Sequence, residues 1–150
     1  MECKLIEYKD KWSIDLIRKL IEKYHDQGVP HGSGNGKTSK YFTYECNGFI
    51  TAVAMIHDST PFYYVAMKFN IQNDRSMFIR RITKTCPGDY LQDFIHEIAL
   101  KLKNDGFEIL WTLGFEDHSN ALYKNTNFEM VGYTTKNKHP VFVLKLKNVK

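Results

Sequence analysis

The sequence predicts a single α/β domain over residues 1–150, with helices packed on a mixed sheet. Three observations favour this class. The length of 150 residues fits one domain. Hydrophobic residues make up 43% of the chain and charged residues 25%, which is an ordinary globular composition. Two stretches have the apolar periodicity of amphipathic helices, and strand-like runs lie before, between and after them.

The first 30 residues predict a strand followed by a helix. Residues 3–8 favour a short strand. After Asp10, apolar residues recur at three- and four-residue steps as far as Tyr24, which is typical of an amphipathic helix. Gly28 and Pro30 then predict the end of this helix.

A polar, glycine-rich segment over residues 30–40 is superficially similar to a phosphate-binding P-loop. That motif needs a glycine five residues before Gly36, where this chain has His31, and it needs a helix afterwards. A strand-like run follows instead. The segment is therefore predicted to be a connecting or substrate-side loop.

The next region predicts a hairpin and then a further strand. Two strand-like runs, 41–46 and 49–57, are separated by Asn47–Gly48. This dipeptide is a strong hairpin signal because both residues tolerate the positive φ of a type I′ turn. The aromatic-rich run 62–71 is predicted to be a strand, within an insertion over residues 58–76 that precedes the strand over 77–83.

The second half predicts alternating strands and helices that close the sheet. The expected elements are a strand over 77–83, a helix over 91–102, a strand over 107–115, a short helix over 118–126, and closing strands over 128–134 and 141–147. The apolar run 107–115 is typical of a strand that is covered on both faces.

The three cysteines give no sign of a disulfide framework or a zinc site. Cys3, Cys46 and Cys86 are odd in number, far apart and without a Cys/His spacing that metals favour. The N-terminal segment is charged and lacks the apolar core of a signal peptide, and no run approaches the roughly 18 apolar residues of a membrane helix. The expectation is a reduced, cytoplasmic protein with no membrane partner.

The formal net charge of +4 is mildly basic. It is lower than expected for a dedicated nucleic-acid-binding protein, and it suits a polyanionic small molecule such as a phosphorylated cofactor.

The strand–loop–helix unit over residues 77–102 is a candidate phosphate site. The N-terminus of a helix binds phosphate oxygens through its free backbone N–H groups. Pro87 is expected in the first turn of the helix, and Gly88 is expected to let a ligand approach the backbone. Nearby positive charge comes from Arg80, Arg81 and Lys84. A plain strand-to-helix connection is an equally good interpretation of these residues alone.

The closing segment resembles that of the GNAT family, the GCN5-related N-acetyltransferases. The similar features are Leu122–Tyr123 on a short helix, then Asn127–Phe128, then Val131–Gly132. The hairpin over 44–56 and the order of elements are also similar to the family. The resemblance implies a mixed, mostly antiparallel central sheet with helices on both faces. Residues 83–89 contain one glycine and depart from the family's Q/R-x-x-G-x-G/A motif.

The resemblance implies an acyl-CoA-dependent N-acyltransferase, with acetyl-CoA or another acyl-CoA as co-substrate and a small-molecule or protein amine as acceptor. Tyr123 is the expected general acid. Glu116 and His118 are candidate bases, with Glu45 and Asp117 as further candidates. His57, at the end of a strand, is a candidate to face the substrate cleft. Residues expected to contact the cofactor are Ile82, Thr83, Lys84, Pro87, Gly88, Asp89 and Tyr123. A homodimer is compatible with the resemblance.

Two alternatives stay open at the sequence level. Phage DNA-modification proteins of the Mom type also lack the glycine loop, and His118, Tyr123 and Asn127–Phe128 are loosely similar to their closing helix. That similarity implies a nucleic-acid substrate. The missing glycines also allow a GNAT-fold binding or inhibitory protein with a degenerate cofactor site.

Overall fold

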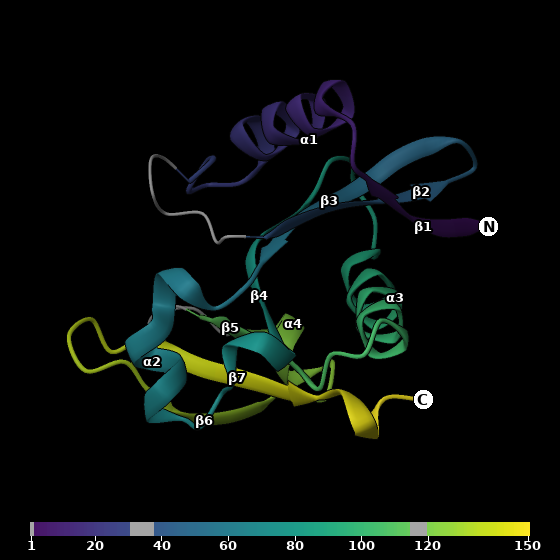
Figure 1. Ribbon diagram of the computed structural model, residues 1–150. Coiled ribbons are helices and arrows are strands. Elements are labelled where there is room, and N and C mark those ends of the chain that lie inside the picture. The colour runs from purple at the N-terminus through teal and green to yellow at the C-terminus, as the bar shows by residue number, and fades with distance from the viewer. Residues whose placement is uncertain (1, 31–37, 115–119) are drawn as a thin grey trace.

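The computed structural model describes residues 2–30, 38–114 and 120–150, and this part of the chain forms a seven-stranded sheet (Figure 1). The strand order is β1-β2-β3-β4-β5-β7-β6, and neighbouring strands are antiparallel apart from the parallel pair β4–β5. The strands are β1 (Cys3–Tyr8), β2 (Ser39–Cys46), β3 (Phe49–His57), β4 (Ser76–Lys84), β5 (Ile109–Leu113), β6 (Glu129–Tyr133) and β7 (Pro140–Lys145). The predicted mixed, mostly antiparallel sheet is confirmed.

Helices cover both faces of this sheet. The helices are α1 (Lys11–Tyr24), α2 (Tyr63–Lys68), α3 (Leu91–Asn104) and α4 (Ala121–Lys124). Residues of α1 and α2 pack on one face, against the side chains of β3, β5 and β7 that point that way, and α3 and α4 pack on the other (Figure 1). None of the helices that the structure describes is long and apolar enough to span a bilayer.

Helix α1 begins and packs as its sequence indicates. The Asp10 carboxylate accepts a hydrogen bond of 2.9 Å from the Ser13 backbone N–H, which satisfies one donor of the first turn. Ile17 and Ile21, one turn apart, are buried against Val53 and Met55 of β3. The Asp10 cap therefore fixes the start of α1, and the amphipathic pattern fixes the face that it buries.

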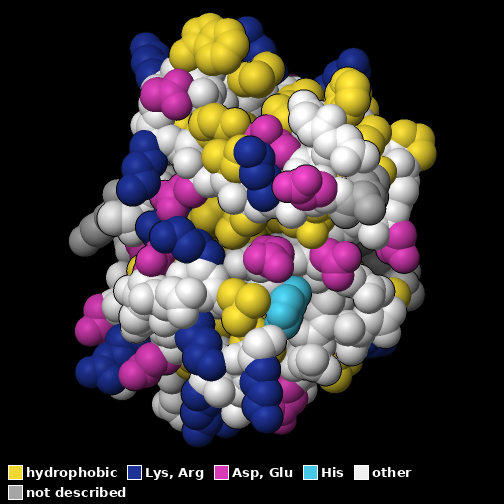
Figure 2. All heavy atoms as spheres, turned by 90° about the vertical axis from the view of Figure 1, so that its right-hand side faces the viewer, with side chains coloured by type: hydrophobic (Ala, Val, Ile, Leu, Met, Phe, Trp, Pro, Cys, Tyr) yellow, Lys and Arg dark blue, Asp and Glu magenta, His cyan; other side chains and the backbone are white. Residues whose placement is uncertain are grey.

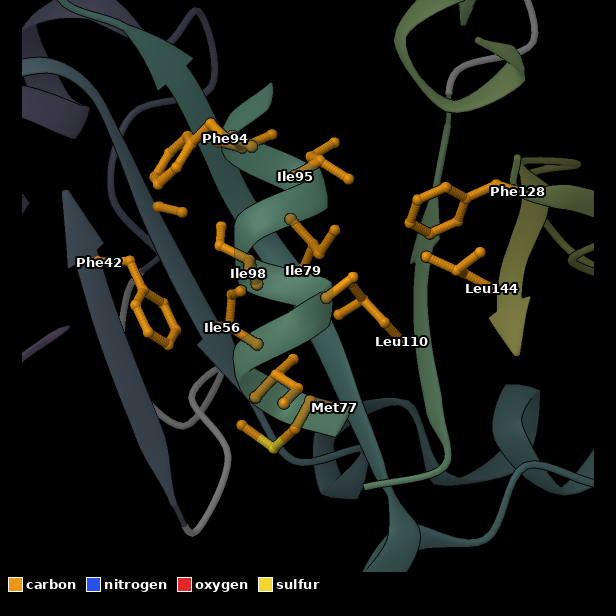
Figure 3. Close-up of a cluster of buried hydrophobic side chains, with 14 of the residues drawn as sticks. Phe42, Ile56, Met77, Ile79, Phe94, Ile95, Ile98, Leu110, Phe128 and Leu144 are labelled. Atoms are coloured by element: carbon orange, nitrogen blue, oxygen red, sulfur yellow. The ribbon is translucent and has the colours of Figure 1, made fainter. Parts of the chain in front are cut away.

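The main core lies between α3 and the sheet (Figure 3). Phe94 and Ile98 point toward the side of Phe42 and Ile56, whereas Ile95 points toward Phe128 and Leu144 on the opposite side. The side chains of α3 that are buried are Phe94, Ile95, Ile98, Ala99 and Leu102. Burial of each large apolar side chain contributes about 1.5–3 kcal/mol. Because α3 contacts both ends of the sheet, it holds the two sides of the sheet together.

The hairpin prediction is confirmed at residue level. Strands β2 and β3 pair antiparallel and are joined by Asn47 and Gly48, whose φ angles are 53° and 84°. These positive values are those of a type I′ turn, whose twist matches that of the flanking strands.

The predicted strand over 62–71 is wrong. Residues Thr60–Phe62 form a 3₁₀ turn that leads into α2. Phe62, Val65, Ala66 and Phe69 recur at helical spacing and pack on the second apolar cluster, which contains Phe78, Trp111, Val141 and Val143. The high β-propensity of the aromatic residues concealed this spacing, and packing decided the outcome.

A glycine in β6 gives α2 its position on the sheet. A Cβ atom at Gly132 would lie 2.7 Å from the Phe69 ring. A side chain at this position would therefore push α2 away from β6. This close approach explains the glycine of the Val131–Gly132 pair, which the sequence resemblance did not explain.

The expectation that the cysteines stay unpaired is also wrong. Cys3 of β1 and Cys46 of β2 are direct partners in the antiparallel register and form a disulfide, while Cys86 has a free thiol. The two residues are 43 positions apart in the sequence. Only the pairing of β1 with β2 brings them together, and cysteine spacing carries no signal of that pairing.

Candidate functional site at the fork of the sheet

Strands β4 and β5 diverge and leave a fork in the sheet. They pair only at Ser76↔Ile109, Met77↔Leu110 and Phe78↔Trp111, although β4 continues to Lys84. The Thr112 hydroxyl donates a 2.9 Å hydrogen bond to the Ile79 carbonyl at the point of divergence. Beyond it, β5 pairs with no further residue of β4, so backbone groups on this edge of β4 can meet a ligand.

A β-bulge in β4 lies beside the fork. Met55 of β3 is opposite Arg81 and the next residue, Ile56, is opposite Ile79, so Arg80 is an extra residue in β4. The bulge breaks the strict alternation of side chains. Arg80 and Arg81 consequently both face the α1–α2 side.

Contacts of the two arginines confirm this direction. The Arg80 guanidinium lies 5.0 Å from the centroid of the Phe62 ring, in the segment that leads into α2. Arg81 donates from Nε to the Gly28 carbonyl at 2.7 Å, beyond the end of α1. The flanking residues Ile79 and Ile82 instead belong to the core under α3.

A cavity of about 820 Å³ lies at the fork, and residues from both faces of the sheet line it. Its walls come from β4, β5, α2, Tyr123 of α4, the segment after α1 and the turn between β6 and β7. Such a volume is in the range of small-molecule and cofactor sites. Among the described residues, no group of three or more metal-ligating side chains is present.

Tyr123 lies at the fork, beside Thr112. Its ring packs edge-on against Phe128, at a centroid distance of 5.5 Å, and against Phe142 at 5.4 Å, while the residue also lines the cavity. Burial raises the pKa of the Tyr123 phenol, and hydrogen bonding with the Thr112 hydroxyl opposes that shift. The phenol is therefore protonated at neutral pH and can donate its proton.

The residues expected to contact the cofactor divide into two groups. Ile82 and Tyr123 line the cavity. The other members do not line it: Thr83, whose hydroxyl contacts the Tyr24 carbonyl at 3.4 Å, and Lys84, Pro87, Gly88 and Asp89, which are exposed at the end of β4 and in the following loop.

Two expectations about the loop before α3 need correction. The helix begins at Leu91, so Pro87 precedes it by four residues and is not in its first turn. A Cβ atom at Gly88 would overlap the Tyr90 ring. The space beside Gly88 is therefore taken by a side chain of this protein, so a ligand does not approach the backbone there.

The candidate bases are only partly placed. Glu116, Asp117 and His118 lie outside the described residues, as does most of the 30–40 loop that was compared with a P-loop. Glu45 lies at the β1–β2 edge, where it accepts hydrogen bonds from Tyr8 (2.8 Å) and Thr43 (2.6 Å), and it does not line the cavity.

His57 lies behind the cavity wall. Its ring is fully buried, near those of Phe62 and Phe78, and its Nδ1 donates to the Asp58 carbonyl at 2.6 Å. Burial lowers the pKa of His57, and the charges of Arg80 and Arg81 lower it further, outweighing the opposing effect of the Asp58 carbonyl. His57 is therefore neutral, but it does not reach the cavity.

Asp58 fixes the junction between β3 and α2. Its buried carboxylate accepts hydrogen bonds from the backbone N–H groups of Thr38 (2.6 Å) and Thr60 (2.9 Å). Burial alone would raise the pKa of Asp58, but these hydrogen bonds outweigh it and hold the pKa below the ordinary value of 3.8. Ionised Asp58 therefore stabilises the fold above that pH, and this contribution is lost as the pH falls through the lower folded value.

We expect Asp58→Asn to lower the free energy of unfolding by about 1.5–3 kcal/mol at pH 7, the range for hydrogen bonds to charged groups. Urea unfolding of the parent and the variant at several pH values measures this difference in the free energy of unfolding. The difference from the parent should shrink as the pH falls below about 4, because the parent carboxylate becomes protonated. Asp74→Asn, at an exposed aspartate, is the control. A difference that is the same at acidic and neutral pH would contradict this explanation.

Sequence comparison relates the chain to one viral protein. It is 54% identical over 141 residues to Uncharacterized protein 154 of Sulfolobus islandicus rod-shaped virus 1, and the match covers 91% of this chain and 92% of the relative. No protein-family model matches the chain.

Structural comparison identifies the architecture. Aminoglycoside acetyltransferase AAC(6′)-Ib in complex with coenzyme A and kanamycin matches with a TM-score of 0.70 at 10% identity, over 96% of this chain and 95% of that one. FeeM, an N-acyl amino acid synthase from uncultured soil microbes, matches with a TM-score of 0.71 at 9% identity, over 98% and 92% of the two chains. The ribosomal-protein-S18-alanine N-acetyltransferase of Escherichia coli matches with a TM-score of 0.59 at 14% identity, over 95% and 91%. These likenesses show the GNAT fold.

Proposed function

The chain belongs to the family of Uncharacterized protein 154 of Sulfolobus islandicus rod-shaped virus 1 and has the GNAT fold, and on this premise we propose that it is an acyl-CoA-dependent N-acyltransferase. The observation that carries the proposal is the placement of Tyr123 at the fork. A protonated phenol and the stretch of β4 that β5 does not pair with border the same cavity.

The fork fits the extended, amide-containing arm of an acyl-CoA. The part of β4 that runs on beyond its pairing with β5 can offer backbone N–H and C=O groups to the amides of that arm. The narrow end lies between Ile79 and Thr112, where the thioester would be held beside Tyr123. A bound acyl-CoA supplies the activated acyl group, while the chain supplies position and protons.

The residues that could bind the phosphates of the acyl-CoA differ in part from those expected from the sequence. Helix α3 has no side-chain N-cap, so the backbone N–H groups of its first turn lack the kind of partner that Asp10 gives α1. These groups and exposed Lys84 can bind phosphate oxygens. Gly88 contributes no close approach, because Tyr90 covers it.

The reaction is a direct transfer. The nitrogen of a neutral amine attacks the thioester carbonyl carbon and forms the C–N bond, and the C–S bond then breaks. The electron pair of that bond goes to sulfur, and Tyr123 donates its phenolic proton to the departing thiolate. The proton lost by the amine goes to a base, for which Glu116 and His118 stay candidates, and solvent reprotonates Tyr123.

Binding of acetyl-CoA to the purified protein tests the proposal directly. Calorimetric titration and thermal unfolding should both show binding, and ligand at about 100 times its Kd should raise the free energy of unfolding by about 2.7 kcal/mol. Adenosine 3′,5′-bisphosphate is the control, because it carries the nucleotide end but cannot enter the fork. No binding of acetyl-CoA, or binding no tighter than this control, would refute the proposal.

The alternatives from the sequence predict other ligands. Acidic and basic side chains are interspersed over the α3 side of the molecule (Figure 2). A duplex-binding surface would instead carry a continuous basic track and give a steep salt dependence. A binding protein with a degenerate site would fail the acetyl-CoA titration. The acetyl-CoA titration therefore tests for a degenerate site, and a duplex titration at several salt concentrations tests for nucleic-acid binding.

A further inference from the structure

The α1–α2 side of the cavity carries a concentration of positive charge. This part, called the acceptor side below, is bordered by Arg80 and Arg81 of β4, Lys68 of α2 and Lys136 of the β6–β7 turn. Among the described residues that line the cavity, none is an aspartate or a glutamate. Lys68 joins two of these walls, since its Nζ donates to the Tyr133 carbonyl at 3.2 Å and lies 3.4 Å from the Thr135 hydroxyl.

The bulge in β4 is the reason that two of these charges are adjacent. In a regular strand, consecutive side chains point to opposite faces, and one arginine would point toward α3. The extra residue Arg80 turns both guanidinium groups to the acceptor side. Both side chains are partly buried, so solvent screens their charges less than it screens surface charges.

Arg81 is held in place with one amino group still available. Its Nε donates to the Gly28 carbonyl at 2.7 Å, and its Nη1 donates to the Arg80 carbonyl at 2.8 Å. Within the described part of the chain, Nη2 of Arg81 makes no hydrogen bond to protein. The guanidinium is therefore pre-organised to bind a further acceptor atom, as in arginine recognition of carboxylate or phosphate.

The positive charges on the acceptor side affect the pKa values of neighbouring groups. Burial lowers the pKa of Arg81, and the charge of Arg80 lowers it further, with Asp26 opposing. Burial and then the charge of Arg81 lower the pKa of His25, which also lines the cavity, while Asp26 again opposes. Burial is the larger cause in both groups, and the neighbouring arginine charge acts in the same direction.

We propose that the acceptor is a small amine that also carries an anionic group, a carboxylate or a phosphate, and that Arg81 binds this group while the amine faces the fork. This inference rests on the proposed function for the reaction, and on the geometry of the acceptor side for the substrate class. It differs from the substrate named for AAC(6′)-Ib, since kanamycin is a polyamine and this side of the cavity carries like charge.

The phosphates of the acyl-CoA are a different anion, and they lie elsewhere in the proposal. They are assigned to Lys84 and the start of α3, on the side of the sheet opposite Phe62 and Gly28. Arg81→Gln is therefore expected to leave the affinity for CoA within about twofold. A large loss of CoA affinity without a change in amine preference would reassign Arg81 to the co-substrate and overturn the proposal.

Two matched pairs of amines test the substrate class and distinguish the two anions. They are O-phosphoethanolamine against ethanolamine, and alanine against alaninamide. Each is titrated by calorimetry into the CoA-saturated protein and into the CoA-free protein. At least one member that carries the anionic group should bind about tenfold or more tightly than the partner that lacks it, a difference of about 1.4 kcal/mol. Equal affinities in both pairs, a preference for the members without the anionic group, or no binding of either phosphoethanolamine or alanine would overturn the proposal.

Variants then assign the preference to Arg81. Arg81→Gln should reduce it to about threefold or less, whereas Arg75→Gln, at an exposed arginine paired with Glu108, should keep it. If Arg81→Gln fails to fold, Lys136→Gln should still lower the preference by about twofold. A preference that persists in both would overturn the proposal. Loss of CoA binding by the parent protein, with the anion preference intact, would refute the proposed function alone.

Discussion

Replacement of Tyr123 by phenylalanine is expected to lower kcat by about 10²–10³-fold, the effect of removing a general acid. The phenyl ring keeps the contacts with Phe128 and Phe142, so the fold and the fork should be retained. The hydroxyl is lost, and with it the phenolic proton and the hydrogen bonding with Thr112. Steady-state release of free thiol from acetyl-CoA, with the best acceptor from the amine pairs, measures the effect.

The specificity of this result depends on two comparisons. The affinity of Tyr123→Phe for CoA should stay within about threefold of the parent, because the phenol acts on the departing sulfur rather than on the binding of the whole molecule. Tyr63→Phe, at an exposed tyrosine of α2, should have parental activity. If Tyr123→Phe retained a third or more of kcat, Tyr123 would not be the acid.

Removal of the Cys3–Cys46 disulfide is expected to lower the free energy of unfolding by about 4 kcal/mol. The bond closes a loop with a sequence separation of 43, and the chain-entropy relation gives this value for a loop of that length. Strand β1 is at the edge of the sheet and pairs with β2 alone among the described strands, so the bond also holds an edge element in place. Urea unfolding of Cys3→Ala/Cys46→Ala measures the change.

A second cysteine variant makes this test selective. Cys86→Ala removes the free thiol and should leave the free energy of unfolding almost unchanged. A reducing agent should destabilise the parent and Cys86→Ala to the same extent, and it should not affect the double variant. Parental stability of the double variant would show that the cross-link contributes nothing to the folded state.

The sequence predicts most of the sheet because local signals and packing agree there. Asp10 and the apolar periodicity of α1, and the Asn47–Gly48 turn, each have a local physical cause that the structure confirms. Helix α2 was missed because its aromatic residues have high β-propensity, and its helical spacing matters only when a second apolar cluster is present to receive it. The disulfide was missed because it depends on strand register.

The candidate site was predicted only in part for a similar reason. Tyr123 was singled out through a family resemblance; it lines the cavity, and its role as the acid stays a prediction. Thr112 reaches the site because β4 and β5 diverge, and Arg80 and Arg81 face the same side because of a bulge. Neither feature has a signal in the sequence. Gly88 was misinterpreted because the position of the Tyr90 ring is a tertiary feature.

The short β4–β5 ladder has a mechanical consequence. Within the described strands, the half-sheets β1–β4 and β5–β7 are joined by three residue pairs of β4 and β5 alone. Helix α3 packs against strands of both halves (Figure 1). An extended ligand at the fork would lie where a further strand would lie, and it would connect the two half-sheets by contacts with both. Amide hydrogen exchange of the β4 residues beyond this ladder would then slow when the ligand binds. Slower exchange in both half-sheets would show that the ligand makes the whole molecule more rigid.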